Sequence, residues 1–218
     1  MGTRIRPHPH TPKNDVSKRA ELCDTMEQAG PDAPTLCEGW RTIDLAAHLV
    51  AREARSDAAV GLVLPGPFAR HLQHVMDRYK ERGYERLVAM LRTGPPWMHR
   101  HGPLATANVN ENFIHHEDVR RASGEPPREL GTELDAVLWR MLGFGARLAR
   151  RHLKDAHLVL RTLDGRECVV SKTGAPVTLT GTPGELTLFM GGRKEAAEVT
   201  HEGDPTAIAI VMAADFGV

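Results

Sequence analysis

The sequence has no excess of charge of either sign. It contains 28 Lys and Arg residues and 28 Asp and Glu residues, which gives a formal net charge of +0 at pH 7. A protein that binds nucleic acid through its overall field carries a basic excess, and a solvating tail carries an acidic one. The even count therefore argues against nucleic acid as a partner. With 41% hydrophobic and 26% charged residues, the composition is that of an ordinary globular protein.

Cysteine is scarce and the hydrophobic runs are short. The three cysteines, Cys23, Cys37 and Cys168, are odd in number and widely spaced, so they form neither a disulfide framework nor a paired metal-binding motif. Cys37 has no basic neighbour in the sequence, and we expect it to be a small buried residue. No apolar signal segment precedes the first helix, and no apolar run is long enough to cross a bilayer. We therefore expect a soluble, cytoplasmic protein with no membrane partner.

Several common catalytic motifs are also missing. Residues 191–194 (GGRK) lack the spacing of a glycine-rich phosphate loop, and residues 181–184 (GTPG) have the composition of a turn. The sequence contains no GxSxG nucleophile elbow and no HExxH zinc motif. A functional site must therefore be sought in residues that lie far apart in the sequence.

Residues 110–121 give the strongest indication of such a site. They contain no Pro or Gly, and Pro103 and Gly124 mark the start and end of a predicted helix. Glu111 and His115 share one face of this helix, while apolar residues occur nearly all round it, as in a helix inside a bundle. An inward-facing carboxylate and imidazole need a partner, because an unpaired buried charge is costly. A bound metal would be one such partner, and a simple hydrogen bond between the two side chains is the alternative.

A third metal ligand is available upstream. The pattern predicts a helix over residues 42–55, in which His48 lies at the edge of the apolar face, one turn after Asp44. Taken alone, His48 is better explained as a core histidine hydrogen-bonded to Asp44. Together with Glu111 and His115 it makes a set of two imidazoles and one carboxylate, which is typical of catalytic zinc and also suits iron or nickel. Bundle cores commonly build metal sites in this way.

The hydrophobic pattern changes from helical to strand-like after residue 152. Upstream of this point it predicts helices over residues 14–29, 42–55, 68–79, 84–92, 103–123 and 130–151. Downstream it predicts strands over 157–162, 167–171, 177–180 and 198–201, with short helices that start at 183 and 205. The sequence therefore predicts an α+β protein with a flexible tail (1–11), a helical domain (12–152) and a small C-terminal α+β domain (153–218).

Three segments resemble the DinB-like, mycothiol-dependent maleylpyruvate isomerase superfamily: residues 36–49 (LCEGWRTIDLAAHL), 111–119 (ENFIHHEDV) and 181–193 (GTPGELTLFMGGR). In that family a histidine of the second helix and an ExxxH pair of a later helix bind a divalent metal. The matching positions here are His48, Glu111 and His115. The resemblance also implies a DinB-like four-helix bundle followed by a C-terminal lobe similar to sterol carrier folds. The sequence looks most similar to a branch described only as metal-binding.

The resemblance implies an enzyme that activates a low-molecular-weight thiol, mycothiol, on a divalent metal. We expect Zn²⁺, with Ni²⁺ or Fe²⁺ as other possible ions. A cation keeps a thiol as its thiolate, which could be transferred to a small electrophile or could add and leave again in a cis–trans isomerisation. Arg193, whose place resembles that of the isomerase's substrate arginine, and Arg52, one turn from His48, are candidates for binding an anionic substrate. Each also has a simpler explanation, as a charge at a helix C-terminus or as a side chain that reaches solvent.

Two other kinds of function stay open. The same site could activate water in a metal-dependent hydrolase. Alternatively, the protein could bind a metal or a small ligand without catalysis. We expect a monomer or a homodimer, and the sequence does not identify the electrophile.

Overall fold

The computed structural model describes residues 13–55, 57, 66–95, 103–149 and 153–216. These residues form eight helices and one four-stranded sheet, which confirms the predicted α+β class. The elements in chain order are α1 (Lys13–Ala29), α2 (Thr42–Ala54), α4 (Pro67–Lys80), α5 (Tyr84–Thr93), α6 (Pro103–Ala122), α7 (Thr132–Ala149), β1 (Ala156–Thr162), β2 (Glu167–Val169), β3 (Ala175–Gly181), α8 (Pro183–Met190), β4 (Thr200–Gly203) and α9 (Pro205–Ala213). The predicted tail, residues 1–11, and residues 150–152 at the predicted domain boundary lie outside the described residues, so both stay predictions.

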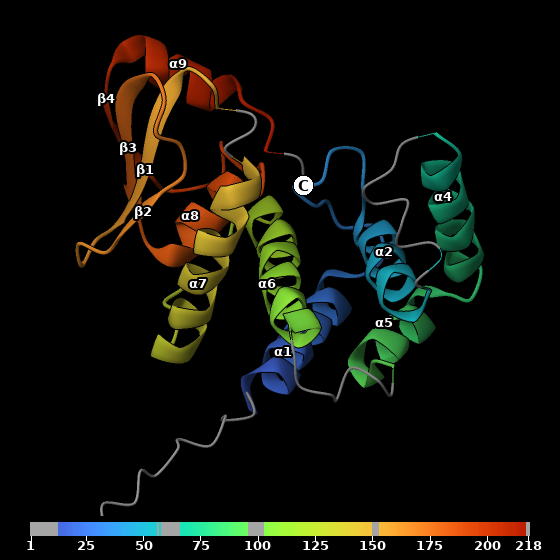
Figure 1. Cartoon of the computed structure of the whole chain (residues 1–218). Coiled ribbons are helices and arrows are strands. Elements are labelled where there is room, and N and C mark those ends of the chain that lie inside the picture. Colours follow the sequence, from blue (N-terminus) through green and yellow to red (C-terminus); the bar gives the residue numbers. More distant parts are fainter. Residues whose placement is uncertain (1–12, 56, 58–65, 96–102, 150–152, 217–218) are drawn as a thin grey trace, which may run out of the picture.

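The helices of the N-terminal half share one hydrophobic core. Figure 1 shows α1, α2, α4 and α5 on one side of α6, and α7, α8 and the sheet on the other. α1 packs on α5 and α6, while α2 packs on α4 and α5. The apolar stripe of each amphipathic helix faces this core. Its fully buried members include Leu22, Met26, Leu45, Leu49, Leu87 and Leu91.

Helix α6 is central to the molecule. Every residue from 112 to 119 is buried, including two histidines and two carboxylates. This confirms the prediction of an interior helix. One side of α6 contacts α1, and Phe113 and Ile114 pack with Leu138 of α7 and Leu188 of α8. Side chains of α6 can therefore contact both halves of the chain.

The sheet has the strand order β2-β1-β3-β4. β1 pairs with β2 in an antiparallel hairpin and with β3 in parallel, so that Leu158 lies beside Val177 and Leu160 beside Leu179. Alternate residues of β1 are buried, as expected for a strand with one face in a core. That core also includes side chains of α7, α8 and α9.

The local signals for the two short helices are confirmed, whereas one strand is displaced. Thr182 caps α8 by accepting a hydrogen bond from Glu185 N, and Asp204 caps α9. The fourth strand was predicted at 198–201 but begins at Thr200. The reason is that Glu198 N donates to the buried carboxylate of Glu185 at 2.7 Å, which takes this amide away from the sheet ladder.

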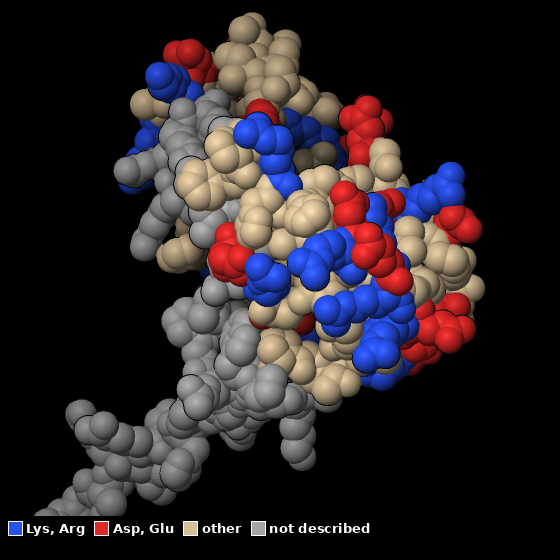
Figure 2. Space-filling view, turned by 90° about the vertical axis from the view of Figure 1, so that its right-hand side faces the viewer, with Lys and Arg blue, Asp and Glu red and all other residues tan. Residues whose placement is uncertain are grey.

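The surface formed by α4 and α5 carries charges of both signs. Asp77, Arg78, Glu85 and Arg86 are exposed residues of these helices. Figure 2 shows charges of both signs intermixed on this side of the molecule. This agrees with the even charge count of the sequence. None of the described helices has the length and apolar character needed to span a membrane.

Candidate functional site

The structure brings His48 of α2 together with Glu111 and His115 of α6. One ligand atom of each lies within 4.8 Å of the others. Nε2 of His115 is 3.5 Å from Oε2 of Glu111, and the centroids of the two imidazole rings are 5.3 Å apart. Both histidines are buried, at 7% and 6% exposure. The three donors therefore have the spacing and the chemistry of a set that could hold one divalent cation.

The environment of His48 leaves one of its nitrogens without a partner. Nδ1 is buried and forms no hydrogen bond to any described residue. Asp44, the partner expected from the sequence, instead accepts hydrogen bonds from Lys80 Nζ and Arg41 N, both at 3.0 Å. The ring of Trp40 packs against the imidazole at 5.1 Å. An unpaired buried nitrogen is unfavourable, and a ligand at this position would remove that cost.

Asp118 fixes the orientation of His115. Its carboxylate Oδ2 lies 2.8 Å from His115 Nδ1, and its side chain is fully buried. The other ring nitrogen, Nε2, therefore faces Glu111. A carboxylate behind a histidine is the usual support of a metal-ligating imidazole, because it selects the tautomer and the ring orientation.

Residues from distant parts of the chain complete the support of Asp118. Arg193, which follows α8, donates to both carboxylate oxygens at 2.8 and 2.7 Å, and the Cys37 thiol donates at 3.2 Å. Arg193 also donates to Cys37 Sγ at 3.2 Å and to the carbonyl of Gly191. The sequence expectation for Cys37 was therefore wrong: the thiol is half-buried and has a basic neighbour, which lies 156 positions away.

Arg52 lies at the end of the donor set nearer the start of α6, whereas Asp118 lies at the end nearer the C-terminus of this helix. Nε of Arg52 is 3.7 Å from Oε2 of Glu111, and its Nη1 donates to Oδ1 of Asn108 at 2.8 Å. Sequence reasoning missed Asn108, Asp118 and the contacts of Cys37. Asp118 could have been found, because it stands three positions after His115 and so shares its helix face.

The charges around His115 favour a cation. Burial opposes protonation of this imidazole, but hydrogen bonds with Asp118, Cys37 and Glu111 outweigh it and raise the pKa of His115 to about 10. Burial likewise opposes ionisation of Glu111, yet His115 and Arg52 lower the pKa of this carboxyl to about 2. Two carboxylates thus stabilise positive charge at the ring of His115. A metal ion bound there would displace the proton from Nε2 and would itself supply the positive charge.

The metal-free protein should lose stability in mild acid. Burial and the charge of His115 lower the pKa of His48 to about 3, and burial with the charge of Arg128 does the same for His116. Below the unfolded pKa of about 6.5, the unfolded chain binds these two protons and the folded chain does not. The free energy of unfolding should therefore fall by about 1.4 kcal/mol per pH unit for each histidine between about pH 6.5 and 4. His115 adds nothing to this slope, because it is protonated in both states below about pH 6.5.

Urea unfolding of the metal-free protein at a series of pH values measures this slope. In the His116→Gln variant about half of the slope should disappear, because one of the two titrating groups is removed while a partner for Thr25, 2.8 Å from the native ring, is retained. An unchanged slope in this variant would contradict the assignment of His116.

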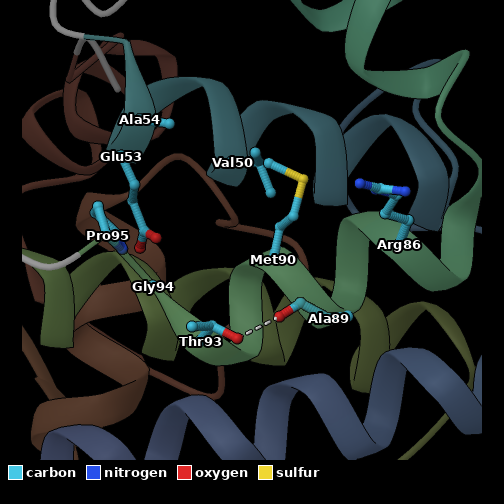
Figure 3. A pocket seen from close by; sticks show the side chains of 9 residues that line it. All are labelled: Val50, Glu53, Ala54, Arg86, Ala89, Met90, Thr93, Gly94 and Pro95. Carbon is cyan, nitrogen blue, oxygen red and sulfur yellow. Dashed lines mark hydrogen bonds between the residues drawn. The ribbon is translucent and has the colours of Figure 1, made fainter.

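Two hollows lie elsewhere on the molecule. One, of about 400 Å³, lies between the end of α2 and α5 (Figure 3). Glu53 lines it, and Arg19 binds the carboxylate of this residue at 2.7 and 2.8 Å. The other, of about 750 Å³, lies between residues 127–130 and the start of α8. Neither is lined by His48, Glu111 or His115.

Comparison with solved structures relates the fold to one enzyme. The crystal structure of the mycothiol-dependent maleylpyruvate isomerase matches with a TM-score of 0.52 and 16% sequence identity, over 86% of this chain and 88% of that one. The chain has the fold of this isomerase. A histidine-to-alanine mutant of the isomerase matches over the same shares, with a TM-score of 0.50 and 15% identity. The predicted resemblance to the mycothiol-dependent maleylpyruvate isomerase superfamily is thereby confirmed at the level of the fold. The sequence matches no family model and no curated protein.

Proposed function

We propose that the chain is a divalent-metal-dependent enzyme that activates a low-molecular-weight thiol, mycothiol, for S-transfer to a small electrophile or for its cis–trans isomerisation. The likeness in fold to a mycothiol-dependent isomerase supports the thiol. The observation that carries the proposal is the approach of His48, Glu111 and His115 within 4.8 Å, with a buried nitrogen of His48 left unpaired. Zn²⁺ suits this donor set best, and Ni²⁺ and Fe²⁺ are other ions that the same ligands bind.

Each residue of the site has a separate role in this proposal. His48, Glu111 and His115 would hold the cation, which when bound would lower the pKa of a thiol and so favour its thiolate. Asp118 would hold the proton of His115 on Nδ1, so that Nε2 is the nitrogen that would give up its proton to the cation. Burial of both histidines limits the access of bulk water to this position.

We also propose that the site depends on both parts of the chain. In this view residues 12–152 form a DinB-like four-helix bundle and residues 153–218 a separate C-terminal lobe. Arg193 of the lobe reaches Asp118 of the bundle. The guanidinium of Arg193 would then support His115 indirectly, through Asp118. The predicted role of Arg193 in substrate binding would require its contacts with Asp118 to break.

A cobalt-substituted protein tests the proposed function. Addition of mycothiol should produce a sulfur-to-cobalt charge-transfer band in the near ultraviolet, because the thiolate enters the coordination of the ion. The His116→Gln variant, which changes an adjacent histidine that faces Thr25, should behave like the unchanged protein. Bound cobalt that gives no such band with mycothiol would contradict thiol activation and favour the hydrolase or the non-catalytic binder.

A further inference from the structure

A second buried group beside the three donors lacks a partner. Asn108 of α6 is 5% exposed, and its Nδ2 forms no hydrogen bond to any described residue. Its Oδ1 accepts from Arg52 Nη1 at 2.8 Å. A guanidinium only donates, so this contact requires the amide oxygen to face Arg52 and leaves the amide nitrogen on the other side. A buried donor without an acceptor is unfavourable and points to an absent acceptor.

Arg52 and Asn108 lie next to the candidate metal site. Arg52 Nε is 3.7 Å from Glu111 Oε2, so the guanidinium lies beside the donor set. Along α6, Asn108 precedes Glu111 by three residues, which corresponds to about 4.5 Å of helix rise. A ligand group at Asn108 would thus lie about one helical turn from the carboxylate of Glu111.

The charges of the occupied site would not cancel. Asp118 and Arg193 neutralise each other in their ion pair of 2.7 Å. The remaining fixed charges are one negative on Glu111 and one positive on Arg52, since ligating imidazoles are neutral. A divalent cation would raise the sum to +2. A thiolate removes only one of these charges, so one anionic group is still lacking.

We propose that Arg52 and Asn108 form a subsite for a carboxylate group of the electrophilic partner, because mycothiol carries no carboxylate. This rests on the proposed function, which supplies the cation and the thiolate. The guanidinium of Arg52 would provide the charge, and Nδ2 of Asn108 a hydrogen bond to one carboxylate oxygen. The subsite thereby orients the electrophile with its double bond toward the donor set. Both residues are positioning residues for specificity and do not take part in bond making.

The thiol arm of the test compares two probes of similar length, 3-mercaptopropionate and 3-mercapto-1-propanol. Both are titrated into the cobalt-substituted protein, and the charge-transfer band gives the two dissociation constants. The carboxylate thiol should bind about tenfold more tightly or better, as one charged hydrogen bond provides. Arg52→Met and Asn108→Leu should remove this preference and leave the binding of the alcohol within about twofold. The matched control Arg78→Met, an exposed arginine of α4, should leave both constants unchanged.

The carboxylate arm uses maleate, which has no sulfur. Calorimetric titration of maleate into the protein, with and without cobalt, should show binding that both variants weaken about tenfold. Loss of maleate affinity in both variants would support the subsite, and loss of the preference for 3-mercaptopropionate would show that the same two residues recognise a carboxylate on a molecule bound at the cation. Failure to bind cobalt would contradict the proposed function, while the maleate titration of the metal-free protein would still decide the subsite. Equal affinities of the variants and the unchanged protein in both arms, with thermal unfolding unaltered, would overturn this inference alone.

Discussion

Replacing Asp118 by asparagine is expected to weaken the binding of a divalent cation by about 10- to 100-fold, the usual effect of losing the partner behind a metal-ligating histidine. The native carboxylate accepts from His115 Nδ1 and from two nitrogens of Arg193. An asparagine amide has one acceptor oxygen, so it cannot serve both donors and its NH₂ group faces one of them. His115 would lose its fixed tautomer. The guanidinium of Arg193, whose side chain is 12% exposed, would lose its counter-charge.

The same variant should lower the free energy of unfolding by about 3–5 kcal/mol, because it leaves a buried charge unpaired. A double-mutant cycle with Arg193→Met separates the two effects. The double variant should regain part of the stability, since neither charge remains, but it should not regain cation affinity. Cation titration and urea unfolding of the four proteins measure both quantities. Unaltered cation affinity in Asp118→Asn would contradict the role of Asp118 as support of His115.

The second large effect is expected at Glu117, which does not belong to the donor set. Its carboxylate is 1% exposed and accepts from Arg120 at 3.0 Å and from Arg121 at 2.9 Å, while Arg128 lies at 2.7 Å. Glu117→Gln leaves three arginines around a neutral amide. Arg121 keeps a second partner, Glu185, at 2.6 Å. We expect a loss of about 3–5 kcal/mol in the free energy of unfolding, because breaking a buried ion pair leaves uncompensated charge.

Glu125→Gln provides the matched control for Glu117→Gln. Glu125 is 60% exposed and lies 3.9 Å from Arg120, so the same chemical change should alter the stability by less than about 0.5 kcal/mol. Urea unfolding measures both variants. The cation content should stay the same in both, since neither carboxylate faces the donor set. A similar small effect of the two substitutions would contradict the importance of the buried arginine cluster.

The helical spacing of apolar residues was enough to predict much of the fold and the first part of the site. The apolar pattern around residues 112–119 correctly predicted an interior helix, because a helix with apolar residues nearly all round must be covered on most sides. The spacing of Glu111 and His115 fixed their common face. His48 was a candidate third ligand from its residue type and its predicted helix, and the family resemblance supported it. The approach of these three residues within 4.8 Å depends on how the two helices pack, which the sequence pattern alone does not specify.

The support of the site was harder to predict, for a physical reason. Arg193 and Cys37 meet across 156 positions of sequence, and no local pattern encodes such a contact. Asn108 was missed because an asparagine on a helix is normally solvated, and only its burial makes its unpaired amide informative. The late start of β4 has a similar origin, since the hydrogen bond from Glu198 N to Glu185 joins residues of two elements.

The central claim is that one divalent cation binds between His48, Glu111 and His115. Metal analysis of the purified protein, beside the His115→Ala and His116→Gln variants, tests it most directly. We predict about one cation per chain in the unchanged protein and in His116→Gln, and almost none in His115→Ala. Equal metal content in the unchanged protein and in His115→Ala would contradict the account.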